Sequence, residues 1–338
     1  MPKPIKTGLL SYGMSGSIFH APFLATNPGF DFKAVVERHE KKAGIKYPGI
    51  ISYNSVEELL NDDSIELVVV YTPNNTHYDF ALSALQAGKH VLLEKPATVT
   101  SRDLKSLFHY SRKLNRQLMI YQNRRYDSGF LLMKEIIESR KLGSLIEVHL
   151  RMDRYRMAIG PKVFTENADI PGNGLLYNLG PHLLDNAISL FGKPVSFKKT
   201  TGVYRPGSQV VDYFHFHLTY PDQLNVFLTS GLLMAEPGYG FVVNGTKGSF
   251  MKYAADPQEK QVDGGMMPNH PDFGKEGDGY LAKLVTIGED IQRKIEWLAA
   301  PKGNYNEIFT AVYETVRNEA PFPVTAEQVL WQLEMLED

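Results

Sequence analysis

The sequence predicts two domains: a doubly wound α/β domain with a parallel sheet, then an α+β domain with a large open, mainly antiparallel sheet. Short apolar runs alternate with helical stretches over about the first 120 residues, as βαβ units do. A glycine-rich turn directly follows the first apolar run. After residue 195, strand-like runs follow one another with only turns between them. We therefore expect domains over residues 1–122 and 123–338, with a C-terminal helix able to pack back on the first.

The composition is that of an ordinary globular protein. The chain has 338 residues, of which 22% are charged, and its formal net charge is −2. This balance argues against nucleic acid or an anionic membrane as a partner. The absence of cysteine excludes disulfides, thiolate catalysis and cysteine-ligated metals, and fits a reducing compartment. No secretion signal or membrane-length apolar window is evident, so a cytoplasmic protein is expected.

Each element of the first domain follows from its apolar pattern. Short continuous apolar runs between turn residues predict buried strands, and apolar residues three and four apart predict helices. Strands are expected over 5–10, 32–37, 67–71, 90–93 and 118–121, and helices over 16–26, 56–60, 76–87 and 101–114. Gly88 follows the third of these helices, at a position that favours a helix C-cap.

The second domain is expected to start with a helix over 130–139, a strand over 145–155 and a loop over 158–173. A helix with a polar first turn then begins near residue 174. Further strands are expected over 196–204, 211–220, 225–233, 240–243 and 249–253. Asn244-Gly245 favours a hairpin turn. Residues 256–280 are predicted to form a long surface loop, and 305–318 and 325–337 amphipathic helices.

The glycine-rich turn resembles the fingerprint of a dinucleotide-binding Rossmann domain. The three glycine positions of that fingerprint hold Ser11, Gly13 and Gly16. The middle glycine lets the backbone approach a pyrophosphate, and the following helix supplies amide donors. Met14 and Ser15 lie between the two glycines and are expected to contact the same dinucleotide. The alternative is an ordinary βα turn.

The end of the second predicted strand bears on the choice of cofactor. Glu37 stands where the fingerprint places an acidic residue that accepts hydrogen bonds from the adenosine ribose. Such a carboxylate would repel a 2′-phosphate, which favours NAD over NADP. Arg38 acts in the opposite sense, because it could stack on adenine or bind a phosphate. The sequence thus favours NAD and leaves NADP open.

Polar residues also follow the third long strand. The loop there is expected to line the ligand crevice, because ligands bind at the carboxyl ends of the strands in such sheets. Helix capping is its alternative role. The residues expected at the cofactor from this loop are Thr72, Pro73, Asn74 and His77.

Glu94 and Lys95 end the fourth long strand and are expected at the same crevice. Pro96 keeps Lys95 out of helical geometry and so restricts the loop that carries it. This placement predicts an active-site role for Lys95. Asn123, after the last strand of this domain, is also expected near the cofactor.

Several segments together resemble the Gfo/Idh/MocA family, the group of glucose–fructose oxidoreductase and inositol dehydrogenase. They include GLLSYGMSGSIFHAPF, VVVYTPNNTHYDFALSALQAGKHVLLEKP, YQNRRYDSGF and GLLYNLGPHLLDNAISLFG. The resemblance implies a Rossmann domain and an α+β domain whose open sheet commonly forms an oligomer interface. It also implies NAD(P)-dependent redox chemistry on sugars, cyclitols or related carbonyl compounds.

The same resemblance assigns roles to three residues. Lys95 matches the family's EKP lysine, His182 matches its histidine, and Asn178 stands where the family usually has aspartate. His182 could serve as the acid/base, and Lys95 could stabilise developing alkoxide charge. Asn178 can hydrogen-bond but cannot act as a base. The alternatives are a core histidine at a helix start for His182 and a helix cap for Asn178.

Further polar residues are weaker candidates for the substrate site. Arg124 follows the last strand of the first domain, and Arg154 and Tyr155 lie near the end of the strand over 145–155. His215 and His217 share one strand face, but no further ligands are evident, so no metal is expected.

The expected protein is therefore a dehydrogenase or reductase that acts on a small carbohydrate-like substrate and forms a homodimer or homotetramer through its open sheet. Two other functions stay open from the sequence. One is a non-enzymatic dinucleotide-binding regulator. The other is an NAD-dependent glycosidase on the same fold.

Overall fold

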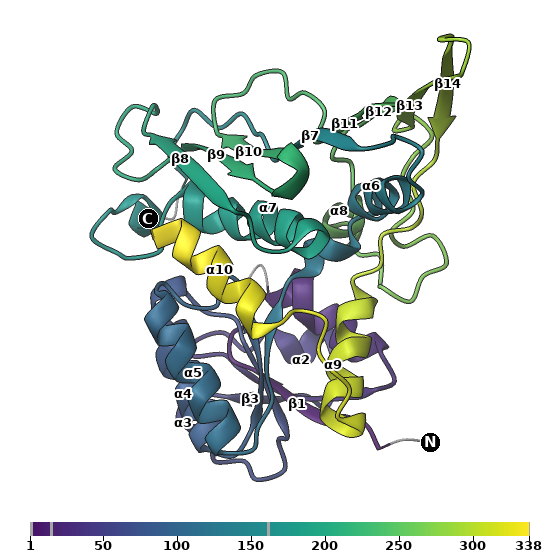
Figure 1. Cartoon of the computed structure of the whole chain (residues 1–338). Coiled ribbons are helices and arrows are strands. Elements are labelled where there is room, and N and C mark those ends of the chain that lie inside the picture. The colour runs from purple at the N-terminus through teal and green to yellow at the C-terminus, as the bar shows by residue number, and fades with distance from the viewer. Residues whose placement is uncertain (1–2, 14–15, 161–162, 338) are drawn as a thin grey trace. The chain divides into compact units, whose positions relative to one another are not determined.

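The computed structural model describes residues 3–13, 16–160 and 163–337. The chain forms two compact units (Figure 1). The first comprises Met1–Asn123, Gln258–Phe273 and Asn304–Leu330, and the second comprises Arg124–Pro257, Gly274–Gly303 and Trp331–Asp338. Two segments from the C-terminal half of the chain thus pack with the N-terminal unit.

The first unit contains a six-stranded parallel sheet in the order β3-β2-β1-β4-β5-β6. The strands are β1 (Ile5–Leu9), β2 (Phe30–Val36), β3 (Ile51–Tyr53), β4 (Leu67–Val70), β5 (His90–Glu94) and β6 (Leu118–Tyr121). The strand order reverses between β1 and β4, which is where doubly wound sheets bind dinucleotides. The predicted parallel sheet is confirmed, with β3 as a strand that the apolar pattern did not predict.

Helices cover both faces of this sheet. Figure 1 shows α3, α4 and α5 on one side and α9 on the other. The helical segments of the unit are η1 (Gly16–His20, a π-helix), α1 (Ala21–Thr26), α2 (Ala43–Lys46), α3 (Val56–Leu60), η2 (Asn74–Thr76), α4 (His77–Gln86), α5 (Ser101–Lys113), α8 (Gln258–Asp263), α9 (Asn306–Asn318) and the start of α10 (Ala326–Glu337).

Local sequence explains where these elements form. All four residues of β4 are buried, as expected for a central parallel strand. The Ser55 and Thr100 hydroxyls accept the backbone N–H groups of Glu58 and Asp103, and so cap α3 and α5. The prediction of a plain surface loop over 256–280 is wrong, because α8 forms there and buries Gln258 and Val262.

The second unit contains an eight-stranded sheet in the order β14-β13-β12-β11-β7-β10-β9-β8. All neighbouring strands are antiparallel except β7 and β10, so the predicted mainly antiparallel sheet is confirmed. The strands are β7 (Leu145–Arg151), β8 (Ser196–Gly202), β9 (Tyr213–Thr219), β10 (Asn225–Gly231), β11 (Phe241–Gly245), β12 (Gly248–Lys252), β13 (Ala282–Ile287) and β14 (Arg293–Leu298).

Two helices cover one face of this sheet. α7 (Leu175–Phe191) contacts β9 and β10, and α6 (Ser128–Glu138) contacts β11 and β12. In β9, Phe214 and Phe216 are fully buried, whereas the alternating residues Tyr213, His215 and His217 are only half-buried on the opposite, open face.

Two local predictions in this unit are wrong. Strand β7 ends at Arg151, and after it the chain makes only an isolated bridge between Tyr155 and Leu233. The hairpin turn lies at Thr246 and Lys247, since Gly245 pairs with Gly248 and Asn244 is still in β11. A Cβ at residue 245 would lie 2.3 Å from the Leu142 carbonyl oxygen, so this glycine serves close backbone packing.

No helix among the described residues is long and apolar enough to cross a membrane.

Candidate active site

The glycine turn after β1 leaves room beside its backbone. A Cβ at Gly16 would lie 2.4 Å from the Ser11 carbonyl oxygen, so packing within the turn requires glycine there. Among the described residues that do not adjoin it, a Cβ at Gly13 would come within 4 Å of the Ser11 hydroxyl alone, at 3.7 Å. Nothing in the described chain therefore requires glycine at Gly13, and the open space beside it suits the approach of a pyrophosphate. Met14 and Ser15 lie outside the described residues.

Glu37 follows β2, but its side chain is turned into the protein. It is 7% exposed. Its carboxylate accepts the N–H groups of Lys42 (2.7 Å) and Ala43 (3.1 Å) and the Ser52 hydroxyl (2.6 Å). The Glu37 side chain thus supplies hydrogen-bond acceptors for backbone N–H groups at the start of the short helix α2.

Arg38, next to Glu37, is exposed and makes no hydrogen bond or ion pair within the parts of the chain that the structure describes. Tyr12 from the glycine turn lies edge-on to Tyr47, with ring centroids 6.3 Å apart. Burial and the nearby Glu37 carboxylate raise the pKa of Tyr12. This end of the sheet therefore offers a free guanidinium and two aromatic rings.

The loops after β4 and β5 are tied together by His77. Its side chain is 1% exposed. Nδ1 lies 2.7 Å from the Pro96 carbonyl oxygen, and Nε2 lies 2.9 Å from the Thr72 carbonyl oxygen. The Lys95–Pro96 peptide bond is cis. Of the neighbouring residues, Pro73 is exposed and Asn74 is half-buried.

Glu94 and Lys95 end β5 at the same edge of the sheet. Glu94 is 4% exposed. One carboxylate oxygen lies 2.8 Å from His20 Nε2, and the other accepts the Lys95 N–H at 3.0 Å. His20 is fully buried and its ring centroid lies 4.6 Å from that of Tyr121. The predicted residue Asn123 is also buried, just beyond β6. Lys95 itself is half-buried.

The second unit carries the other predicted residues. Gly174 has a φ of +90°, and a Cβ there would lie 3.0 Å from the Val211 carbonyl oxygen, so glycine is required where α7 begins. Asn178, in the first turn of α7, is exposed. One turn further on, His182 is 5% exposed. The helix therefore places the two side chains on one face, as their spacing predicts.

A buried ion pair that the sequence did not predict anchors this helix. Asp185 is 1% exposed and accepts two hydrogen bonds from Arg125, both at 2.7 Å, and one from Gln332 at 2.8 Å. Burial alone would lower the pKa of Arg125, but Asp185 outweighs this effect and raises it. His182 thus lies on a helix that is fixed by a bidentate charge pair one turn away.

For two of the weaker candidates for the substrate site, the structure describes contacts with other residues of the protein. Arg124 pairs with Asp127 at 3.1 Å. The Arg154 backbone N–H donates to the Gly231 carbonyl at 3.0 Å. Tyr155 is 57% exposed.

The open face of the sheet carries the two histidines that were predicted to share one face of a strand. His215 and His217 stack on Phe227, with centroids 5.9 and 4.6 Å away. Their ring nitrogens lie 2.9 Å from the Thr229 hydroxyl and 2.8 Å from the Asn225 side-chain oxygen, respectively. Among the described residues, no three His, Asp or Glu side chains are grouped so that they could hold a metal ion.

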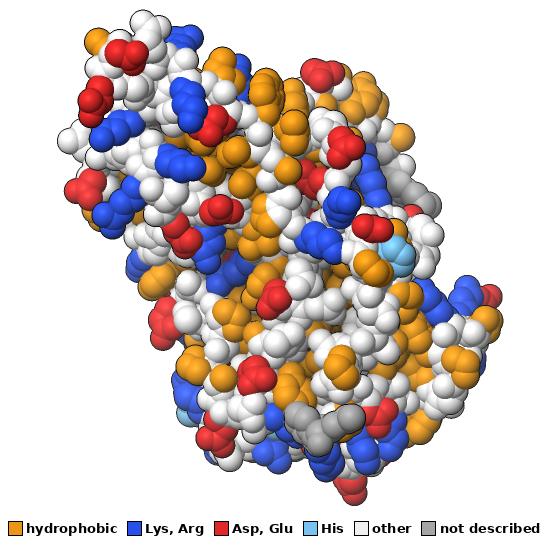
Figure 2. All heavy atoms as spheres, turned by 90° about the vertical axis from the view of Figure 1, so that its right-hand side faces the viewer, with side chains coloured by type: hydrophobic (Ala, Val, Ile, Leu, Met, Phe, Trp, Pro, Cys, Tyr) orange, Lys and Arg blue, Asp and Glu red, His pale blue; other side chains and the backbone are white. Residues whose placement is uncertain are grey.

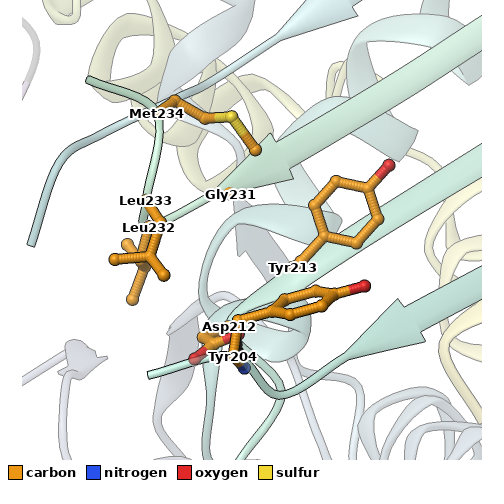
Figure 3. Close-up of a pocket in the computed structure, with 7 residues that line it drawn as sticks. All are labelled: Tyr204, Asp212, Tyr213, Gly231, Leu232, Leu233 and Met234. Atoms are coloured by element: carbon orange, nitrogen blue, oxygen red, sulfur yellow. Dashed lines mark hydrogen bonds between the residues drawn. The ribbon is translucent and has the colours of Figure 1, made fainter. Parts of the chain in front are cut away.

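A cavity of about 330 Å³ lies at the edge of the same open face. Figure 3 shows the Tyr204 and Tyr213 rings beside each other, with their hydroxyls pointing the same way. Gly231 forms part of the wall, and a Cβ there would lie 2.5 Å from Met234 Cε. The cavity is lined by Tyr204, Asp212, Tyr213, Gly231, Leu232, Leu233 and Met234. None of the sequence-predicted site residues lines it.

Surface charge is mixed. On the face in Figure 2, Lys and Arg side chains are interspersed with Asp and Glu, and no wide region of one sign is visible there.

Comparison with known proteins identifies the class. Residues 5–122 match the model of an oxidoreductase family with an NAD-binding Rossmann fold, and residues 134–338 match the C-terminal alpha/beta domain of that family. The chain belongs to the Gfo/Idh/MocA family of oxidoreductases. It is therefore an enzyme of the dehydrogenase or reductase type, with a Rossmann domain for a nicotinamide dinucleotide.

Individual relatives are similar over nearly their whole length. An uncharacterized oxidoreductase of Schizosaccharomyces pombe is 40% identical, covering 97% of this chain and 94% of that protein. The Bacillus subtilis protein IolW, named scyllo-inositol 2-dehydrogenase (NADP(+)), is 32% identical, covering 98% and 92%. The crystal structure of an oxidoreductase from Bacillus cereus has a TM-score of 0.87 and 32% identity, covering 98% and 95%.

Proposed function

We propose that this enzyme transfers a hydride between a nicotinamide dinucleotide and a CH–OH carbon of a sugar, a cyclitol or a related hydroxy compound. The observation that carries the proposal is the placement of Lys95. It follows β5 at the sheet edge that also holds the open glycine turn after β1. The name of IolW, a cyclitol dehydrogenase, supports this substrate class.

In this reaction one residue transfers a proton and another stabilises charge. The dinucleotide, when bound, accepts or supplies the hydride. His182 takes the hydroxyl proton of the substrate in oxidation and returns it in reduction. The Lys95 ammonium stabilises negative charge that develops on the substrate oxygen. Asn178, one helical turn before His182, donates a hydrogen bond to the substrate without adding charge. Arg124, Arg154 and Tyr155 bind further substrate hydroxyls.

Substitution of His182 and of Lys95 tests these two roles. His182→Ala is expected to lower kcat by roughly a hundredfold or more, the usual contribution of a positioned acid/base. Lys95→Ala is expected to lower kcat as well, because transition-state charge loses its partner. Wild-type turnover by His182→Ala would refute the proposed role.

For the cofactor, we infer a preference for NADP over NAD, which revises the expectation from the sequence. The supporting observation is that the Glu37 carboxylate already accepts three hydrogen bonds within the protein and is 7% exposed. It is therefore a poor acceptor for ribose hydroxyls and is not aimed at a 2′-phosphate. Arg38 has no partner among the described residues and suits a phosphate. The name of IolW specifies NADP(+).

Arg38 provides the test of this preference. Arg38→Gln is expected to lower kcat/KM for NADP⁺ roughly tenfold or more, because a hydrogen bond between charged groups is worth about 1.5–3 kcal/mol. The value for NAD⁺ should hardly change. Arg112→Gln, at an exposed position near the end of α5, is the matched control and should affect neither. A wild-type enzyme that prefers NAD⁺ would contradict the inference.

The assembly and location are further parts of the proposal. We infer a homodimer or homotetramer that forms through the open sheet face, where Phe227 and its histidine neighbours are half-buried. We also infer a cytoplasmic location, because a chain without cysteine is compatible with a reducing compartment. Sedimentation equilibrium tests the assembly: twice or four times the chain mass of 38.1 kDa is expected, and the mass of one chain would contradict it.

A further inference from the structure

His77 is a deeply buried titratable side chain near Lys95, and the proposed chemistry does not use it. It is the first residue of α4 and is 1% exposed. Its ring lies between two loops. One follows β4 and contributes the Thr72 carbonyl, and the other follows β5 and contributes the Pro96 carbonyl. The second of these loops carries Lys95, so His77 links that loop to its neighbour across the sheet edge.

The two contacts of His77 determine how many N–H donors the ring needs. Both partners are carbonyl oxygens, which accept hydrogen bonds and cannot donate them. They lie 2.7 Å from Nδ1 and 2.9 Å from Nε2, both within hydrogen-bonding range. A neutral imidazole carries one N–H and can satisfy only one of them. The imidazolium carries two and satisfies both.

The surrounding charges bear on this protonation. Burial is the largest effect, and it holds the pKa of His77 below its usual range; the two carbonyls and the nearby Glu94 carboxylate favour the charged ring but do not outweigh burial, and Lys95 disfavours the charged ring. His20 also contacts Glu94, through Nε2, and its buried Nδ1 has no hydrogen-bond partner among the described residues. One N–H therefore suffices for the contacts of His20 within this part of the chain, whereas His77 has acceptors for two.

We propose that His77 is a positioning residue for Lys95, and that its imidazole joins the Thr72 and Pro96 carbonyls fully only when it is protonated. In this arrangement the ring holds the backbone on the C-terminal side of Lys95, while Glu94 holds the Lys95 N–H on the other side at 3.0 Å. The side chain of Lys95 thereby starts from a backbone fixed at both ends. Loss of the His77 proton releases one carbonyl and loosens the loop.

The functional part of this inference rests on the proposed role of Lys95, whereas the protonation part does not. His77→Gln has both of its N–H donors on one nitrogen, and so cannot replace two donors that lie on different atoms of the ring. We expect it to lower kcat roughly tenfold to hundredfold, the cost of a catalytic group displaced by about an ångström. The KM for the dinucleotide should change much less. His109→Gln, on the exposed side of α5, is the matched control and should behave as the wild type.

The second readout is independent of turnover. Imidazole ¹⁵N shifts of the full chain, assigned with the His77→Gln variant, should show one protonated His77 nitrogen in the neutral ring and a second as the pH falls below the usual imidazole range. Amide exchange of residues 94, 95, 97 and 98, corrected for intrinsic rates, should slow as His77 gains its second proton. His77→Gln should lack this pH dependence.

The outcomes separate the claims. A ring that keeps one unprotonated nitrogen at every pH at which the protein stays folded, or a His77→Gln enzyme with wild-type kcat, would overturn the positioning role. A fully active Lys95→Ala enzyme with a normal His77 titration would instead overturn the proposed function and leave the protonated link intact. If His77→Gln fails to fold, His77→Asn, whose donors are likewise on a single nitrogen, replaces it in both measurements.

Discussion

At the scale of single residues, Asn178 stands where the resemblance to the family leads us to expect an aspartate. Asn178→Asp would place a carboxylate one helical turn before His182. The negative charge favours an imidazolium, so we expect the acidic limb of the pH–rate profile for oxidation to move to higher pH. The shift should be a few tenths of a pH unit, because the position is exposed and screened. Asn178→Ala is the control and should not move the limb; a profile of Asn178→Asp that superimposes on the wild type would argue against contact between the two groups.

The residue scale also shows what the sequence could and could not predict. Lys95 and Glu94 could be placed at the sheet edge, because the end of an apolar strand is readable from its pattern. The contact of His20 with Glu94 spans 74 positions and leaves no local signal. The pair of Arg125 and Asp185 spans 60.

For Glu37 the position in the chain was predictable but the contacts of its side chain were not. Its position was predicted correctly at the end of β2, but its side chain binds the amides of a four-residue helix that the sequence did not predict.

At the scale of elements, the turn between β1 and η1 offers a matched pair of glycines. Gly16→Ala would place a Cβ 2.4 Å from the Ser11 carbonyl oxygen, and such overpacking typically costs about 1–3 kcal/mol of unfolding free energy. Gly13→Ala has space and should leave stability within about 0.5 kcal/mol. It should nevertheless weaken dinucleotide binding, because the methyl group fills the approach of the pyrophosphate.

Urea unfolding and fluorescence titration with NADPH check this pair of variants. If Gly13→Ala bound NADPH as tightly as the wild type, the turn would not be the pyrophosphate site.

The errors at this scale have a common physical cause. β14 carries exposed residues on both faces, including Trp297 at 60%, and Ile291 in the turn between β13 and β14 is 81% exposed, so burial does not follow a regular apolar alternation there. Asn244-Gly245 favours a hairpin turn by itself, but the pairing register with β12 moves the turn two residues on. Tertiary pairing decided both outcomes.

At the scale of the whole molecule, His90 predicts how stability depends on pH. Burial, together with Arg116 and Arg317, lowers the pKa of His90 to about 4. Its Nδ1 accepts the Gln117 N–H at 3.0 Å and must be neutral to do so. The unfolded chain, with an imidazole pKa of about 6.5, therefore takes up the proton first as the pH falls. Unfolding free energy should drop between about pH 6.5 and pH 4 and then level off for this group.

His90→Asn keeps an acceptor and removes the titration, so its stability should depend less steeply on pH over that interval. His109→Asn is the exposed control. Parallel curves for the wild type and His90→Asn in urea unfolding at several pH values would show that His90 is not the group responsible.

Redox turnover with a nicotinamide dinucleotide is the central activity proposed for this enzyme, and absorbance at 340 nm tests it most directly. The purified full-length protein would be incubated with NADP⁺ or NADPH and a panel of cyclitols, sugars and their keto forms. We expect a net change in NADPH with at least one member, faster with NADP(H) than with NAD(H), and abolished in His182→Ala. Tight dinucleotide binding without any change at 340 nm, or sugar release without net NADPH change, would contradict the proposed dehydrogenase and favour a regulator or a glycosidase.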